Sequence, residues 1–287
     1  MVAYLSVYQL LKKYNIRPKK SLGQNFLADE NHLRKIVAAA NLSSQDVVLE
    51  IGPGLGVLSA SLAEAAGQVV AVETDAAMVD ILRAEMAGVA NFHVVRANIL
   101  DVDPAAALAA HCPEFAPGDT YHVAANLPYY ITSAIIQHLL EAPHPPQRIV
   151  ITVQKEVAQR ITARPGQMSL LAVSVQFYGQ PRLCHTIPAN AFVPPPKVES
   201  AVLSIDRYRQ PPLEVDDRAA FFRVVKAGFS QKRKQLKNSL AAGLHMPQVE
   251  VVAWMEAAGI DPVRRAETLS LPEWGALVKL AANFASV

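Results

Sequence analysis

The residues best suited to chemistry in this chain form the pentapeptide Asn126–Tyr130, which reads Asn-Leu-Pro-Tyr-Tyr. The apolar run His122–Ala125 before it predicts the end of a strand, so the pentapeptide lies at a sheet edge, where open α/β sheets bind ligands. It offers an amide oxygen, backbone carbonyls beside a proline and two aromatic rings. These groups suit the exocyclic amine of a nucleobase, because the acceptors take its N–H groups and a ring stacks on the base. The alternative is a proline-ended strand followed by two core tyrosines.

A glycine-rich turn, Gly52-Pro53-Gly54-Leu55-Gly56, follows another apolar run and opens a helical stretch. Its glycines let the backbone approach a ligand where Cβ atoms would collide. Val57 stands where the dinucleotide fingerprint GxGxxG has its last glycine, so a pocket for a nucleoside without phosphates is favoured over a pyrophosphate cradle. Glu73 ends the next predicted strand, where an acid can accept hydrogen bonds from both ribose hydroxyls. Together the turn and the acid indicate S-adenosylmethionine, although plain turn glycines and a solvated acid are the structural alternatives.

The elements that must position these residues alternate along the chain. Apolar, β-rich runs predict strands, and Ala/Leu-rich stretches between them predict helices, which is typical of a parallel sheet covered on both faces. The predicted strands are Val47–Ile51, Val69–Val72, Phe92–Val95, His122–Ala125 and Arg148–Val153, and the predicted helices are Leu55–Ala66, Ala76–Ala87 and Ser133–Glu141.

The second half of the chain predicts a boundary between two domains. A helix at Met168–Phe177 precedes two closing strands, Leu183–Ile187 and Ser200–Tyr208, which are joined through the proline-rich loop 192–196. The polar, Pro-containing stretch Arg209–Leu213 predicts a linker, and the pattern after it is helical to the end. We therefore expect an α/β domain with a parallel sheet in residues 1–209, with a basic N-terminal arm, and a small all-helical domain in residues 210–287.

Charge is distributed unevenly along the chain. The net charge is +2, but residues 1–28 carry five basic side chains and residues 218–248 carry seven, with no acid in either segment. The remaining residues must therefore carry a net charge of −10. Two basic segments on an otherwise acidic protein indicate a polyanionic partner such as a nucleic acid, and a pair of solvated helix faces is the alternative.

Composition narrows the class of protein further. Of the 287 residues, 51% are hydrophobic and 18% are charged, which favours a well-filled core over disorder. The only cysteines, Cys112 and Cys184, form no CxxC motif, so we expect them to be reduced. The histidines are scattered, so no metal site is expected. No apolar run reaches the length of a membrane span and no signal peptide is evident, so a cytoplasmic protein is expected.

Six segments together resemble the ribosomal RNA adenine dimethyltransferase family, in particular its small-subunit dimethyladenosine transferases. The resemblance runs from about Lys19 to Leu240, and the joint order of the segments is more specific than any one of them. The segments are Lys20–Leu27, Glu50–Gly56, Asn126–Tyr130, Gln154–Ala158, Phe192–Val198 and Phe229–Lys234.

The resemblance implies that residues 1–209 form a Rossmann-like, S-adenosylmethionine-dependent methyltransferase domain, and it implies a role for individual residues. Asn25, Leu27, Gly52, Gly54 and Glu73 match positions on the cofactor side. Asn126 matches the residue between cofactor and target amine, with Pro128 beside it, and the aromatic residues Tyr129 and Phe192 match positions that bracket a flipped adenine. Asn98 stands where families of this type usually carry Asp; its amide oxygen can accept the same hydrogen bond from the cofactor's adenine without charge assistance.

The implied activity is transfer of methyl groups from S-adenosylmethionine, without a metal, to the N6 amine of adenines in small-subunit ribosomal RNA. Two adjacent adenines are expected to be dimethylated in a pre-ribosomal particle, by an enzyme that we expect to be a monomer. RNA is expected to be held by Lys232, Arg233, Lys234 and Lys237, with Arg233 and Lys237 on one helix face. The alternatives are a large-subunit adenine methyltransferase, a non-catalytic ribosome-assembly factor and a small-molecule methyltransferase, the last disfavoured by the acid-free basic segment.

Overall fold

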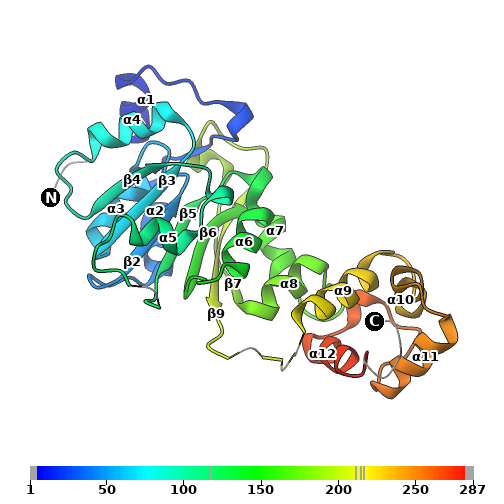
Figure 1. Ribbon diagram of the computed structural model, residues 1–287. Coiled ribbons are helices and arrows are strands. Elements are labelled where there is room, and N and C mark those ends of the chain that lie inside the picture. The colour runs from blue at the N-terminus through cyan, green and yellow to red at the C-terminus, as the bar shows by residue number, and fades with distance from the viewer. Residues whose placement is uncertain (1–4, 117, 211, 214, 216, 282–287) are drawn as a thin grey trace. The chain divides into compact units, whose positions relative to one another are not determined.

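A computed structural model describes residues 5–116, 118–210, 212–213, 215 and 217–281 of the chain (Figure 1). The chain divides into two compact units, Met1–Ala158 with Arg182–Arg207, and Gln159–Pro181 with Tyr208–Val287. This division differs from the expected domains, 1–209 and 210–287, mainly in one segment, since 159–181 belongs to the second unit. Residues 1–4 and 282–287 of the expected domains, and Pro211 of the expected linker, lie outside the described residues.

The first unit is organised by a sheet that has seven strands within the described residues, in the order β4-β3-β2-β5-β6-β9-β7 (Figure 1). The strands β2 to β6 run parallel, and β9 is inserted antiparallel beside β6. Every predicted strand is present, although β7 begins before the predicted Leu183. The bounds are β2 (Val47–Ile51), β3 (Gln68–Glu73), β4 (Phe92–Arg96), β5 (His122–Asn126), β6 (Arg148–Gln154), β7 (Gly179–Ile187) and β9 (Ser200–Arg207).

Helices cover both faces of this sheet because the connections proceed in two directions from β2. The helices α3 (Val57–Ala65) and α4 (Ala76–Glu85) connect β2 to β3 and β3 to β4, toward the β4 edge. The helix α5 (Pro104–Ala109) returns from β4 past β2 to β5, and α6 (Thr132–Glu141) continues in the same direction from β5 to β6. Right-handed crossovers therefore place the two pairs on opposite faces. A further helix, α2 (Glu30–Ala40), packs on α3, β5 and β6.

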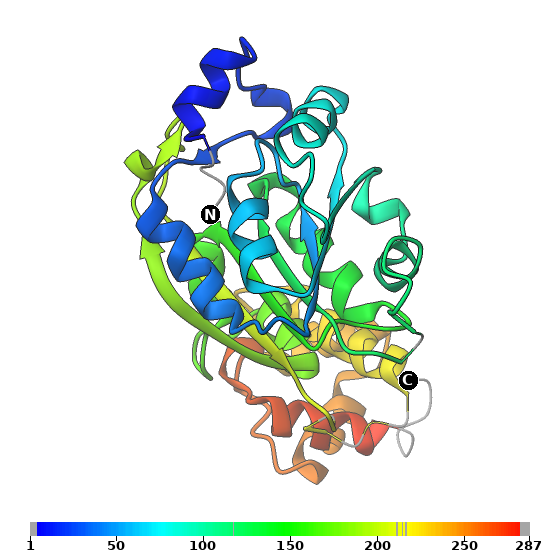
Figure 2. The same ribbon diagram turned by 90° about the vertical axis from the view of Figure 1, so that its left-hand side faces the viewer.

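The N-terminal arm is ordered against this framework (Figure 2). Its helix α1 (Val7–Lys13) buries Val7 and Leu10 in one cluster with Met78 and Ile81 of α4. The arm continues through the 3₁₀ turn Lys20–Leu22 to a two-residue strand, β1 (Phe26–Leu27). This strand pairs antiparallel with β8 (Phe192–Val193), so the proline-rich segment begins as a strand, where a loop was expected.

The second unit is helical around two buried tryptophans, Trp254 and Trp274. The indole N–H of Trp254 donates to the Leu277 carbonyl at 2.8 Å. Gly228 is required by packing, because an added Cβ would lie 2.5 Å from the Trp274 ring. The helices are α8 (Leu170–Tyr178), α9 (Arg218–Phe229), α10 (Leu236–Leu244), α11 (Gln248–Ala257) and α12 (Leu271–Lys279), while α7 (Lys155–Ile161) spans the boundary between the units.

Candidate active site

A cavity of about 420 Å³ lies in the first unit at the carboxyl ends of β2, β3, β4 and β5. Ligands bind at this edge of open α/β sheets, because the loops that follow parallel strands converge there. The predicted residues that line the cavity are Asn25, Leu27, Gly52, Gly54, Glu73, Asn98, Asn126, Pro128 and Tyr129.

The glycine turn forms the floor of the cavity in a left-handed backbone conformation. Gly52 and Gly54 have φ of 64° and 58°, a region that favours glycine. At Gly54 an added Cβ would lie 2.9 Å from the Phe26 ring, so a side chain has no room there. At Gly52 the nearest atom to an added Cβ is Pro128 Cδ at 4.0 Å, so the absent side chain leaves space on the cavity side. The turn therefore allows close approach of a ligand to the backbone.

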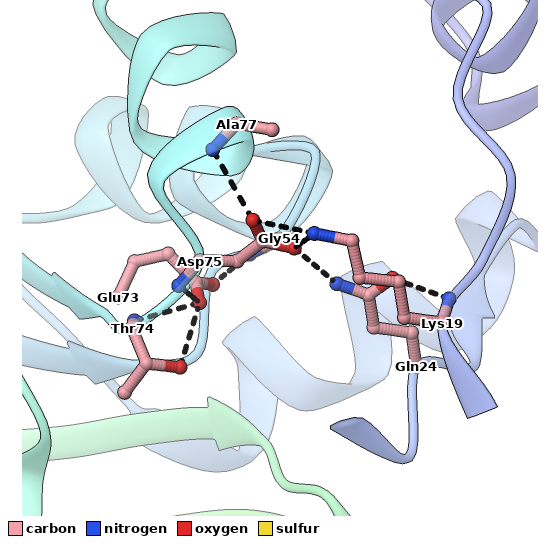
Figure 3. Close-up of polar contacts among 7 residues, drawn as sticks. All are labelled: Lys19, Gln24, Gly54, Glu73, Thr74, Asp75 and Ala77. Carbon is pink, nitrogen blue, oxygen red and sulfur yellow. Dashed lines mark hydrogen bonds and ion pairs between the residues drawn. The ribbon is translucent and has the colours of Figure 1, made fainter. Parts of the chain in front are cut away.

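The carboxylate of Glu73 is held in place by backbone N–H groups of two loops (Figure 3). Its Oε2 accepts from Gly54 at 3.1 Å, and its Oε1 accepts from Thr74 at 2.8 Å and from Asp75 at 2.9 Å. The residue is 7% exposed and lines the cavity. Because these bonds fix both oxygens, the carboxylate is an oriented acceptor for hydroxyl groups of a bound nucleoside.

Asn126 ends β5 and connects the sheet to the N-terminal arm. Its Nδ2 donates to the backbone carbonyl of Asn25 at 3.0 Å. None of the residues that the structure describes donates to its Oδ1. The fixed amide therefore leaves Oδ1 available as an acceptor on a residue that lines the cavity.

The two tyrosines after Pro128 lie in different environments. The Tyr129 hydroxyl shares a 2.6 Å hydrogen bond with the hydroxyl of Ser200, which is fully buried at the start of β9. Burial raises the pKa of Tyr129, and this hydrogen bond opposes the shift. Tyr130 is 64% exposed at the cavity, and its ring lies 3.3 Å from where a Cβ of Gly23 would stand. One ring is therefore anchored and the other is open to solvent.

Two predicted residues have surroundings that the sequence did not indicate. Phe192 is 2% exposed in the core, pairs with Leu27, and is absent from the cavity lining, so its stacking on a base stays a prediction. Asn98 caps a 3₁₀ turn: its Oδ1 accepts from Leu100 N at 3.2 Å, and its Nδ2 donates to Asp101 Oδ2 at 3.0 Å. Asn98 lines the cavity, but its Oδ1 already accepts a hydrogen bond from a backbone N–H.

Sequence reasoning missed Glu50, which lines the cavity and is 1% exposed. Its Oε2 accepts no hydrogen bond from the described residues. Burial raises the pKa of Glu50 to about 8, and the charge of Glu73 adds to this shift. The signal that could have identified it is an acid inside the otherwise apolar strand Val47–Ile51, because isolated acids are rarely buried.

The basic residues near α10 were expected to share one helix face, and they do not. Lys232, Arg233 and Lys234 lie exposed in the turn between α9 and α10, and Lys237 lies half-buried in the first turn of α10. The expectation of one helical face through Arg233 and Lys237 is wrong, because Gln235 is extended (ψ 148°) and the helix begins after it. None of the four forms an ion pair with a described residue.

The described residues include neither a group of metal-ligating side chains nor a helix that could cross a membrane. Within residues 5–281, apart from the four undescribed positions, no three His, Cys, Asp or Glu side chains are grouped so that they could hold a metal ion. In the same part of the chain, each helix is too short or too polar to span a membrane.

The strand order, with β9 reversed beside β6, and the glycine turn followed by an oriented acid define a Rossmann-like methyltransferase. A family model described as "Ribosomal RNA adenine dimethylase" matches residues 15–283, and the chain belongs to this family. It is therefore a methyltransferase enzyme, as the sequence predicted.

Relatives and solved structures agree with this assignment. The chain is 43% identical to "Ribosomal RNA small subunit methyltransferase A" of Dehalococcoides mccartyi over 93% of this chain and 89% of that protein. It is 40% identical to the protein of the same name from Geobacillus thermodenitrificans over 94% and 92%. The structure is similar to that of the 23S rRNA methyltransferase ErmE (TM-score 0.70, 29% identity, 89% of this chain and 98% of that chain). A dimethyladenosine transferase from Plasmodium falciparum shares the fold (TM-score 0.72, 23% identity, 90% and 98%).

Proposed function

We propose that this chain dimethylates the N6 amines of two adjacent adenines in small-subunit ribosomal RNA, during ribosome assembly in the cytoplasm. The observation that carries the proposal is the fixed amide of Asn126, a residue that lines the cavity and whose Oδ1 stays available as an acceptor. The relatives that are 40–43% identical, named as small-subunit methyltransferases, favour this RNA over the large-subunit RNA named for ErmE. We further propose that the enzyme acts as a monomer.

The residues present fit S-adenosylmethionine as the methyl donor. The space beside Gly52 and the oriented carboxylate of Glu73 suit a nucleoside, and the volume of about 420 Å³ is within the range of small-molecule sites. Asn25, Leu27, Gly54 and Asn98 complete the proposed binding surface. The bound cofactor supplies a methyl group that is already activated by the positive charge of its sulfonium, so the protein needs no metal for this step.

The remaining work of the chain is to strip water from the adenine amine and to orient it. The Asn126 Oδ1 and the Pro128 carbonyl would accept its two N–H groups, which favours a pyramidal, nucleophilic nitrogen. Such positioning is worth up to about 7–11 kcal/mol of a reaction barrier. Stacking on the anchored ring of Tyr129 would contribute roughly 1–3 kcal/mol and offset the cost of flipping the base. The exposed turn Lys232–Lys234 and Lys237 would contact phosphates.

The proposal is tested by methyl transfer from labelled S-adenosylmethionine to small ribosomal subunits that lack adenine methylation. We expect label in adjacent adenines, each carrying two methyl groups after digestion and mass spectrometry. Large subunits and an Asn126→Ala variant serve as controls. Label found only in large subunits would replace the proposal with the large-subunit alternative. Tight binding to small subunits without any transfer would instead support a non-catalytic assembly factor.

A further inference from the structure

One side of the cavity is closed by the N-terminal arm, which is tied to the turn after β3 by a single carboxylate (Figure 3). Lys19 Nζ donates to the Oδ1 and Oδ2 of Asp75 at 2.9 and 2.8 Å, and Gln24 Nε2 donates to Oδ2 at 3.2 Å. The Gln24 side chain also accepts from the backbone of Lys19 at 2.9 Å. Both ends of the segment 19–24 are therefore joined to Asp75.

Asp75 also belongs to the loop that holds the proposed ribose-binding acid. Its backbone N–H donates to Glu73 Oε1 at 2.9 Å, while its side chain faces the arm. On the arm, Gly23, Gln24 and Asn25 line the cavity directly. A displacement of Asp75 would thus move both the acceptor on β3 and the wall that the arm provides.

In the Lys19–Asp75 ion pair only the carboxylate is buried. Its charge therefore depends on the arm for compensation. The side chain of Asp75 is 4% exposed and that of Lys19 is 49% exposed. A buried carboxylate that loses its cationic partner is costly, because its charge is left without compensation. Burial alone would raise the pKa of Asp75, but the hydrogen bonds from Lys19, from the Ala77 N–H and from Gln24 outweigh it and lower the pKa.

We infer that Asp75 is a positioning residue, which latches the arm segment 19–24 over the cofactor cavity and makes arm closure and cofactor binding mutually dependent. It acts through Glu73 and through the arm, not by contact with the reacting atoms. The inference rests on the proposed function only for the identity of the cofactor. By linkage, cofactor binding favours arm closure by the same factor by which arm closure tightens cofactor binding.

The chain offers a matched control in a second contact between the arm and α4. Glu85 accepts from Lys13 Nζ at 2.6 Å and from the Tyr14 hydroxyl at 2.5 Å. None of these three residues lines the cavity. Loss of this contact would loosen α1 without touching the wall of the cofactor site.

The test compares Asp75→Asn with Glu85→Gln, since both replace an arm-binding carboxylate by an amide. Asparagine also caps helices, so Asp75→Asn preserves the hydrogen bond from Ala77 N at the start of α4. Calorimetry with S-adenosylhomocysteine should show about tenfold weaker binding for Asp75→Asn, as expected when charge-assisted hydrogen bonds are lost. Glu85→Gln should stay within about twofold of the unmodified protein.

Three further variants distinguish a contact that holds the arm from a general loss of stability. Lys19→Met should weaken binding as Asp75→Asn does, the double variant should lose little more than either, and Lys19→Arg should restore most of the affinity. In hydrogen exchange, S-adenosylhomocysteine should slow the amides of residues 19–25 in the unmodified protein but not in Asp75→Asn.

Unchanged affinity in Asp75→Asn, or an equal loss in Glu85→Gln, would overturn the inference. Additive losses in the double variant would do so too. None of these measurements involves RNA, so their failure is distinct from failure of the methyl-transfer assay on ribosomal subunits.

Discussion

The side-chain amide of Asn126 donates to the backbone carbonyl of Asn25, which lies 101 positions earlier in the chain. This hydrogen bond engages Nδ2, and no described residue donates to Oδ1, so Oδ1 is the atom of the amide that stays available. The residue at the end of β5 therefore contacts the arm through Nδ2, and we propose that its Oδ1 accepts from a substrate amine.

Asn126→Ala should lower methyl transfer by on the order of 100-fold or more, since it removes an acceptor that orients the amine in the transition state. The affinity for S-adenosylhomocysteine should change much less, because Glu73 and the glycine turn remain. Single-turnover rates and calorimetry check the two parts. A turnover close to that of the unmodified enzyme would exclude the proposed role.

Tyr129 should act through its ring, whereas its hydroxyl serves to anchor that ring to Ser200. Tyr129→Ala should cost roughly 1–3 kcal/mol of RNA-dependent transfer, the typical value of one base–aromatic stack. Tyr129→Phe and Ser200→Ala keep the ring and should cost clearly less. Equal losses in Tyr129→Ala and Tyr129→Phe would show that the hydroxyl, and not the stack, carries the effect.

Asn98→Asp should bind S-adenosylmethionine as tightly as the unmodified protein or more tightly, because a carboxylate accepts the adenine amine with charge assistance. The structure adds a complication, since Asn98 donates to Asp101 and two carboxylates would repel there. The double variant Asn98→Asp/Asp101→Asn removes that repulsion and should show the larger gain in calorimetry. Weaker binding in the double variant would contradict the proposed contact of Asn98 with adenine.

The basic turn should hold RNA through phosphates. Changing Lys232, Arg233, Lys234 and Lys237 to Ala should weaken RNA binding and reduce the slope of log K against log salt by about one unit for each lost phosphate contact. The affinity for S-adenosylmethionine should be unaffected. Filter binding across a salt series measures the slope, and an unchanged slope would mean that these residues are only solvated.

Glu50 should make stability depend on pH. Its pKa is about 8 in the folded chain against an ordinary value of 4.5, so between these values the unfolded chain releases a proton that the folded chain retains. The free energy of unfolding due to this group therefore falls as pH rises through that window and levels off above it. Glu50→Gln should become progressively more stable relative to the unmodified protein from about pH 5 to pH 8.

Urea unfolding at a series of pH values measures this difference, and Glu64→Gln on the exposed side of α3 is the matched control. A difference that does not change with pH would show that Glu50 is ionised in the folded protein throughout.

The strands and the glycine turn could be predicted because their signal is local. Buried parallel strands are continuous apolar runs, and a left-handed turn at a ligand needs glycine. The local pattern also predicts the helix Leu170–Tyr178, as Met168–Phe177, but its membership of the second unit could not be predicted in this way. It belongs to the second unit because Phe177 packs on Phe221 of α9, with ring centroids 4.7 Å apart, and that contact joins residues far apart in the sequence.

The same limit explains the error near α10. The Leu236 N–H donates to the Arg264 carbonyl at 2.7 Å, which holds the chain extended at Gln235 although no glycine or proline marks a break. The sequence placed Asn126 and Glu73 at the cavity, because both end parallel strands. The partners of Asp75 lie 56 and 51 positions away, and no local pattern pairs them.

The pairing of β1 with β8 has a consequence for synthesis of the chain. Phe26 and Leu27 close the cavity beside Phe192 and Val193, and Tyr129 is anchored to Ser200. A nascent chain acquires the strands β2 to β6 before Phe192, Val193 and Ser200 have been translated. We expect a ribosome-bound fragment that ends before residue 192 to bind S-adenosylhomocysteine poorly, however well its sheet has formed. Competence for the cofactor would then arise late in translation, once the sheet is complete and while helices α9 to α12 are still being made.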